Sequence, residues 1–507
     1  MEYFDINNNK IFFGSTDKLQ EWGADNFEQS RIIDKIKIML KNYLELDNVS
    51  FLFGSGTSIH LGAVAIRNFP KEVEECIKEK DKKLQGLLDL FNSTIKSLQA
   101  DILETGSKKL DPKTSTFTDE KNWTFIIEDG LVRDSESKEI AIEYETVLNF
   151  LIALEFIYEK DRTSKGKENI TYLISTIKEG LFNACNLENR TVSSSVIERK
   201  KKSPFKSDNS HAELLANKSK YIFHEKFVKA LLQRPLNLRR ANIFTSNYDL
   251  AFEYAFDKLG VHYIDGFSGF HKRFFKPETF EYDIFYPGST TSGKVQRIEK
   301  VVRYIKLHGS MSWVNSEARD ANNLYGIEEK PLELIESLDK KGEIIIYPSA
   351  VKKSYTLDLP YSELFRQFAT TITQSQSVLI TVGYSFADEH FNDIIFQALS
   401  NPTFTLIIVD FTGTQSQYIK EIMELNDPRI IILEGSFFGD FLTFSDILMP
   451  NFNNVENYDR IANTLNSLLG NAKNQTQQLD TQPEVEISAV GQSDTNGAQA
   501  NTNPLQS

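Results

Sequence analysis

One histidine and one asparagine stand out because each directly follows a short apolar run that favours a β-strand. His308 follows VVRYIKL and precedes Gly309 and Ser310, and Asn247 follows ANIFTS. An imidazole with an ordinary pKa of about 6.5 can accept a proton as a general base, and a carboxamide both donates and accepts hydrogen bonds. The pair could therefore orient a water molecule or a sugar hydroxyl and take up its proton. The structural alternatives are a satisfied core histidine and a helix-capping asparagine.

A glycine-rich turn follows an earlier apolar run. VSFLF ends at Phe53, and GSGTS comes next, with Gly54, Ser55, Gly56 and Ser58. Two glycines would let the backbone approach a pyrophosphate, and Ser58 could cap a helix whose N-terminus offers free N–H groups to an anion. Glycines also form ordinary strand-to-helix turns, so this motif alone leaves both interpretations open.

Three further polar residues lie at or just after the ends of strand-like runs. Ser385 comes shortly after SVLITVG, which ends at Gly383, and Asp410 ends FTLIIVD. We expect Ser385 and Asp410 to contact the adenosine side of a dinucleotide. Asp249, two residues after Asn247, could cap a helix, orient Asn247 or contact a ribose.

The elements that must position these residues alternate between strand and helix. Apolar runs of four to seven residues recur after residue 240, and helical segments lie between several of them. This pattern predicts an α/β fold with a Rossmann-like, doubly wound and mostly parallel sheet, in which ligands bind beyond the carboxyl ends of the strands. The set of strand-end residues therefore describes a dinucleotide pocket that carries reactive groups. The turn lacks the third glycine of the dehydrogenase fingerprint, because His60 follows Ile59.

The chain divides into segments of different composition. We expect residues 1–48 to form an N-terminal extension with a helix before a first strand at VSFLF, and residues 49–60 and 236–470 to form the core. Residues 61–235 are rich in amphipathic segments and predict a mostly helical insertion, with Ile142, Leu148, Ile152 and Phe156 on a buried helix face. Residues 471–507 are polar and without aromatic side chains, which predicts disorder.

Charge and cysteine content exclude several classes. A formal charge of -14 makes direct nucleic-acid binding unexpected, and the basic segment ERKKKSPFK is interpreted as a solvated loop. Cys76 and Cys185 are too far apart for a CxxC metal motif, so no metal site is expected, and a reducing cytoplasm fits the chain. The start MEYFDINNNK is unlike a signal peptide, and no apolar run is long enough for a membrane span.

Four motifs in order resemble the sirtuin superfamily. They are GSGTS, TSNYD, LHGS and GYS, which correspond to the family's GAG-x-S turn, T-x-N-x-D motif, HG pair and late G-x-S. The resemblance implies NAD as the ligand. Sirtuin deacylases also carry a zinc ribbon of four cysteines, which two cysteines cannot form, so zinc is not expected and the peptide-binding groove is in doubt.

A closer resemblance is to sirtuin-like NADases of bacterial antiphage defence, particularly the subunit that pairs with a HerA-type ATPase. It depends on LDNV, NYDLA, GFSGFHKRFF, KLHGSMSW, IYP with nearby Lys352, and NPTF. The resemblance implies hydrolysis of NAD to nicotinamide and ADP-ribose, death or dormancy by NAD depletion, a homo-oligomer and an ATPase partner. A protein deacylase, a non-catalytic NAD or ADP-ribose sensor and a DNA-cutting subunit remain alternatives.

The expected catalytic residues are Asn247 and His308. The expected NAD-binding residues are Gly54, Ser55, Gly56, Ser58, Asp249, Gly309, Ser310, Gly383, Ser385 and Asp410.

Overall fold

A computed structural model provides the structure of the protein. It describes residues 8–23, 29–64, 69–82, 86–95, 98, 108–110, 117–119, 126–128, 131–133, 139–140, 144–161, 164–192, 219–286, 296–316, 323–337, 341 and 360–450. The predicted disordered tail and the IYP motif with Lys352 lie outside these ranges.

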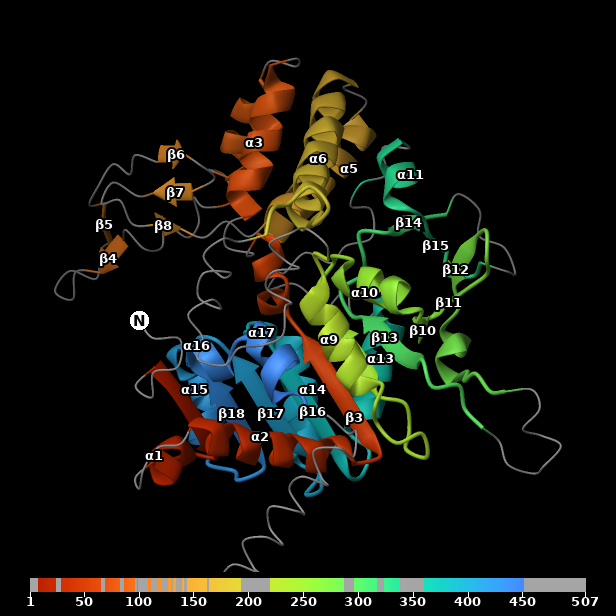
Figure 1. The fold of residues 1–507 in the computed structure, drawn as a ribbon. Helices are drawn as coiled ribbons and strands as arrows, with labels where there is room; N and C mark the ends of the chain where they lie inside the picture. Colours follow the sequence, from red (N-terminus) through yellow and green to blue (C-terminus); the bar gives the residue numbers. More distant parts are fainter. Residues whose placement is uncertain are drawn as a thin grey trace, which may run out of the picture. The chain divides into compact units, whose positions relative to one another are not determined.

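A nine-stranded sheet forms the centre of the fold, in the order β10-β13-β9-β3-β16-β17-β18-β1-β2 (Figure 1). The strands are β10 (His262–Ile264), β13 (Val301–Lys306), β9 (Asn242–Thr245), β3 (Asn48–Phe53), β16 (Ser377–Val382), β17 (Thr405–Asp410), β18 (Ile430–Glu434), β1 (Asn9–Phe13) and β2 (Thr16–Asp17). The pairings from β10 to β18 are parallel. The predicted fold class, an α/β Rossmann-like sheet, is confirmed.

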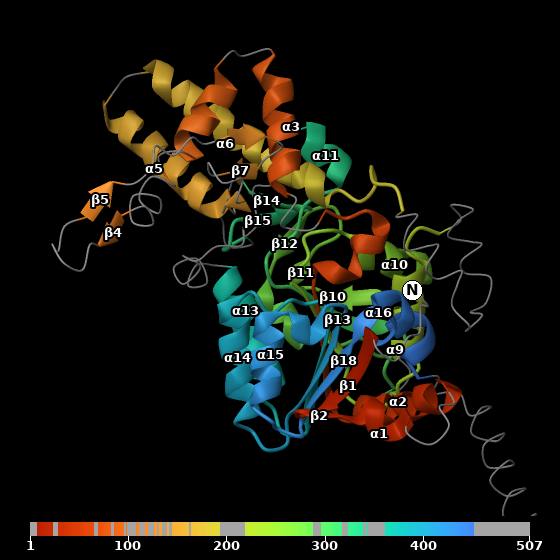
Figure 2. The same ribbon diagram turned by 90° about the vertical axis from the view of Figure 1, so that its left-hand side faces the viewer.

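Helices cover both faces of this sheet, because its strands are apolar on both sides. In β3, Phe51 and Phe53 pack on one face and Leu52 on the other. One face holds α2 (Gln29–Leu44), α9 (Ile222–Leu231) and α10 (Ala251–Leu259). The other holds α13 (Tyr361–Ile372), α14 (Glu389–Leu399) and α15 (Gln417–Glu424), as Figure 2 shows. The two layers leave the ends of the strands open for a site.

The N-terminal segment differs from the expectation that the first strand is VSFLF. β1 precedes it and pairs antiparallel with β18, with Ile11 opposite Leu433. Ile11 is fully buried in the core. Residues assigned to an extension therefore contribute an edge of the central sheet.

In the described part of residues 61–235, the long helices α3 (Phe69–Asp81), α5 (Tyr144–Asp161) and α6 (Ser164–Cys185) share one apolar cluster. Five short strands also occur there: β4 (Lys108–Leu110), β5 (Phe117–Asp119), β6 (Ile126–Glu128), β7 (Leu131–Arg133) and β8 (Glu139–Ile140). α9 instead packs on the central sheet.

The prediction of which face of α5 is buried is partly wrong. Leu148 is buried, but Ile152 and Phe156 are 45% and 60% exposed. The buried side of α5 runs through Val147 and Leu151, because that side faces the apolar cluster with α3 and α6. Ile142 lies outside the described residues.

A small antiparallel sheet is built from chain segments before and after β13. It contains β11 (Phe267–Ser268), β12 (Arg273–Phe275), β15 (Ile327–Glu329) and β14 (Trp313–Asn315), in that order. No described helix is both long and apolar enough to cross a membrane.

Candidate functional site

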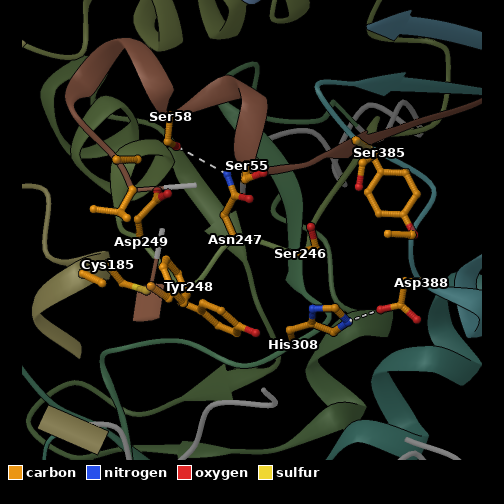
Figure 3. Close-up of a pocket in the computed structure, with 16 residues that line it drawn as sticks. Ser55, Ser58, Cys185, Ser246, Asn247, Tyr248, Asp249, His308, Ser385 and Asp388 are labelled. Carbon is orange, nitrogen blue, oxygen red and sulfur yellow. Dashed lines mark hydrogen bonds and ion pairs between the residues drawn. The ribbon is translucent and has the colours of Figure 1, made fainter. Parts of the chain in front are cut away.

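A cavity lies beyond the carboxyl ends of β3, β9, β13 and β16, where the strand order reverses around β3. It encloses about 820 Å³ of space, including its open mouth. This position is typical of ligand sites in doubly wound folds. Six predicted residues line it: Ser55, Ser58, Asn247, Asp249, His308 and Ser385 (Figure 3).

Asn247 is fixed by the glycine turn and does not cap a helix. Its Nδ2 donates to the carbonyl oxygen of Gly54 at 3.0 Å and lies 3.2 Å from Thr57 Oγ1 and 3.3 Å from Ser58 Oγ. A carbonyl oxygen only accepts, so the nitrogen of the amide must face the turn. Because no described residue donates to Asn247 Oδ1, that oxygen can accept a hydrogen bond from a ligand.

His308 is buried at the cavity wall and contacts a carboxylate that the sequence analysis did not include. Its Nε2 lies 3.0 Å from Asp388 Oδ2 (Figure 3). The other oxygen of Asp388 accepts from the backbone N–H of His390 at the start of α14. The imidazole also packs beside Phe391, with ring centroids 5.0 Å apart. The Asp388 carboxylate therefore contacts both the first turn of α14 and the candidate base, His308.

Asp249 lines the cavity and lies just before α10, whose N-cap residue is Leu250 and which has no side-chain cap. Its Oδ1 accepts from the backbone N–H of Ala251 at 3.0 Å. The described side chains of Asp249 and Asn247 share no hydrogen bond. The idea that Asp249 orients Asn247 therefore has no support from a direct contact.

The glycine turn differs from the expected anion site. It continues as two short 3₁₀ turns, Ser55–Thr57 and Ile59–Leu61, and Ser58 makes no side-chain cap. The backbone N–H of Gly54 donates to Val382 and that of Gly56 to Gly383, so neither amide points freely to a phosphate. The expected helix N-terminus is absent at this described position.

The glycines instead allow two turns to interlock. A Cβ on Gly54 would lie 2.5 Å from the carbonyl oxygen of Gly383, and one on Gly56 would lie 2.7 Å from its Cα. Gly383 itself has a φ of +59°, in the left-handed region that favours glycine. Close backbone approach explains why glycine occupies these positions, and their expected contact with NAD stays a prediction.

Other predicted residues lie near the cavity without lining it. Gly309 turns the chain after His308 with a φ of 87°, and Ser310 Oγ lies 2.9 Å from Ser312 Oγ. Asp410 Oδ1 accepts from the backbone N–H groups of Thr412 and Gly413, at 2.9 and 2.7 Å. Asp410 therefore stabilises its own turn, and its expected contact with ribose stays a prediction.

An apolar wall of the cavity comes from the insertion and was not predicted from the sequence. Val64, Phe69 of α3, and Ala184 and Cys185 at the end of α6 line the cavity. Burial, followed by the charge of Asp249, raises the pKa of Cys185 to about 12. Asp388 had one sequence signal, an acid just before a helical segment, whereas these wall residues had none.

The described residues include no group of three or more histidine, cysteine or acidic side chains arranged to hold a metal. In the small antiparallel sheet, Arg273 of β12 contacts two carboxylates. Its Nη2 lies 2.9 Å from both oxygens of Asp265, and its Nη1 contacts Glu329 of β15.

Residues 241–410 match the family model of the SIR2-like domain. The match includes Asn247, His308 and Asp388, and it begins after the glycine turn. It supports a sirtuin-like protein with NAD-related activity. No curated protein matches the chain.

Proposed function

We propose that the protein is an NAD glycohydrolase that cleaves NAD to nicotinamide and ADP-ribose. The observation that carries the proposal is that the Asn247 amide and the His308 imidazole line one cavity at the strand-order reversal of a SIR2-like sheet. The cavity has polar groups at the glycine turn and apolar groups from the insertion. This combination suits a ligand that carries both hydrogen-bonding groups and a flat aromatic ring.

The bond to nicotinamide breaks through an oxocarbenium-like state, and nicotinamide is a good leaving group because it departs from a cation. The protein then has to hold the ribose and direct a water to it. Asn247 Oδ1 can accept a hydrogen bond from that water or from a ribose hydroxyl, while its Nδ2 stays bound to the turn. The amide is thereby held in one orientation.

His308 would take up the proton, with Asp388 setting which nitrogen does so. A carboxylate only accepts, so Asp388 favours the tautomer in which Nε2 carries the hydrogen. Nδ1 is then the basic atom, and it lies on the side of the ring that faces Ser246 and Asn247 (Figure 3). Asp388 also stabilises the imidazolium that proton transfer produces.

The resemblance to antiphage NADases supports a wider role for this activity. We infer that the protein is the toxic effector of a defence system, acts by NAD depletion as a homo-oligomer, and works with a HerA-type ATPase. Mixing the purified protein with such an ATPase and following nicotinamide release tests this part separately.

The direct test is to incubate the protein with NAD and quantify products, with and without an acyl-lysine peptide. We expect nicotinamide and ADP-ribose in equal amounts without the peptide. Consumption of NAD only when the peptide is present would identify a deacylase, and binding without turnover would identify a sensor.

A further inference from the structure

We propose that Lys306 is a positioning residue that fixes the Asn247 loop relative to His308. The inference rests on the proposed function, because it assigns a role in the same reaction. Lys306 ends β13, and His308 lies two residues later in the turn that follows the strand. The side chain of Lys306 reaches the loop from residue 246 to 250.

The ammonium group of Lys306 is fully used by this loop and by the helix that follows it. Nζ donates to the carbonyl oxygen of Tyr248 at 3.3 Å, to that of Asp249, and to Glu253 Oε1 at 2.8 Å. An ammonium has three N–H donors, and three acceptors meet them. The peptide groups on both sides of Asp249 are therefore held by the last residue of the strand that precedes the candidate base.

Burial makes the arrangement rigid. The side chain of Lys306 is 4% exposed, and Glu253 is buried on α10. Burial raises the pKa of Glu253, although Lys306 opposes that change. The second oxygen of Glu253 accepts from Tyr304 Oη at 3.0 Å. A buried carboxylate with these partners keeps the ammonium in one place, and the ammonium keeps the loop in one place.

A buried ion pair also has a simpler interpretation, in which it serves stability alone. The two roles differ in what happens when both charges are removed together. Loss of one partner leaves a buried charge without compensation, whereas replacing both by apolar groups of similar size is often nearly neutral for stability. A purely structural pair would then recover its activity along with its stability. A positioning residue would not, because the carbonyl oxygens of Tyr248 and Asp249 would still lack their donors.

The experiment compares Lys306→Met with the double variant Lys306→Met/Glu253→Met. Steady-state nicotinamide release gives kcat and KM, calorimetry gives NAD affinity, and thermal unfolding gives stability. We expect the double variant to fold, to bind NAD within a few-fold of the unchanged protein, and to lose roughly 10- to 100-fold in kcat, as expected for a misplaced catalytic group. If Lys306→Met alone fails to fold, the double variant carries the test.

The matched control is Lys226→Met/Asp446→Leu, which removes a partly buried ion pair on α9, outside the cavity lining. It should keep the kcat of the unchanged protein. A Lys306→Met/Glu253→Met variant with unchanged kcat would overturn the positioning role. An unchanged protein that releases no nicotinamide would instead overturn the proposed function, so the two failures are distinguishable.

Discussion

At the scale of single residues, the candidate site depends on protein contacts that hold the side chains of Asn247 and His308 in place. The Asn247 amide nitrogen is held by the glycine turn, and His308 Nε2 lies against Asp388. Asn247 thus has its nitrogen held by the protein and an oxygen that can accept from a substrate, and the His308 imidazole is held beside a carboxylate. Such fixed polar groups reduce the reorganisation needed during the reaction.

The contact between Asp388 and His308 predicts the effect of replacing one carboxylate oxygen of Asp388 by an amide nitrogen. Asp388→Asn keeps the size of the side chain but removes its charge, so it should weaken both the tautomer preference and the stabilisation of imidazolium. We expect kcat to fall about 10²- to 10⁴-fold, the range of general acid–base assistance, with little change in NAD affinity. Asp393→Asn, an exposed change on the same helix, is the control. Equal kcat values for the two variants would remove Asp388 from the mechanism.

At the scale of elements, the interlocked turns after β3 and β16 hold the cavity in shape. Gly383→Ala would place a Cβ 2.8 Å from Gly56 Cα, at a φ of +59°. Gly260→Ala meets a similar φ of +62° but has no heavy atom within 4 Å, so it isolates backbone strain from crowding. We expect about 1–2 kcal/mol of destabilisation for Gly260→Ala, and about 1–3 kcal/mol more for Gly383→Ala. Urea denaturation measures both, and equal losses would show that crowding is unimportant.

The small antiparallel sheet predicts a pH dependence of stability. Burial, followed by the charge of Asp265, raises the pKa of Glu329 to about 7, despite the contact with Arg273. A carboxyl whose pKa is raised in the folded state stabilises the fold below its unfolded pKa of about 4.5 and loses that contribution as pH rises through 7. We expect the free energy of unfolding to fall by about 3 kcal/mol across this range.

In Glu329→Gln the side chain cannot ionise, so the free energy of unfolding should fall less as pH rises. Glu328→Gln is the control, because Glu328 pairs with Lys330 at 2.7 Å and not with Arg273. Urea denaturation at a series of pH values measures the slope. The same slope in Glu329→Gln and the unchanged protein would contradict the assignment.

At the scale of the whole molecule, the long apolar strands were predictable and the short ones were not. β9, β13, β16, β17 and β18 are apolar runs buried on both faces, so local pattern and tertiary burial agree. β1 depends on pairing with β18, which lies more than 400 residues later, and three-residue strands such as β10 and β12 have too little pattern of their own.

The candidate site was partly predictable for the same reason. Strand-end positions brought Asn247 and His308 to one cavity, because parallel strands share a carboxyl edge. Asp388 and Cys185 reach it through helix ends whose placement depends on packing. The anion role given to Gly54 and Gly56 was inferred from their motif, but their backbone N–H groups are used by β16 and its turn.

The alkylation rates of the two cysteines can show where NAD binds in the intact protein. Cys185 lines the cavity, and Cys76 on α3 does not; burial raises the pKa of Cys76 to about 11. In His308→Ala, which should consume NAD only slowly, NAD at about 100 times its Kd should slow alkylation of Cys185 roughly 100-fold. Cys76 should react at an unchanged rate. Mass spectrometry reads both thiols in one sample, and equal effects on both would place NAD elsewhere.

The central claim is that His308 and Asn247 act on NAD bound in one cavity. Its most direct test is nicotinamide release by His308→Ala, measured together with NAD affinity on the same preparation. The account predicts a fall in kcat of about 10²- to 10⁴-fold with affinity nearly unchanged. Release of nicotinamide at the rate of the unchanged protein would contradict it.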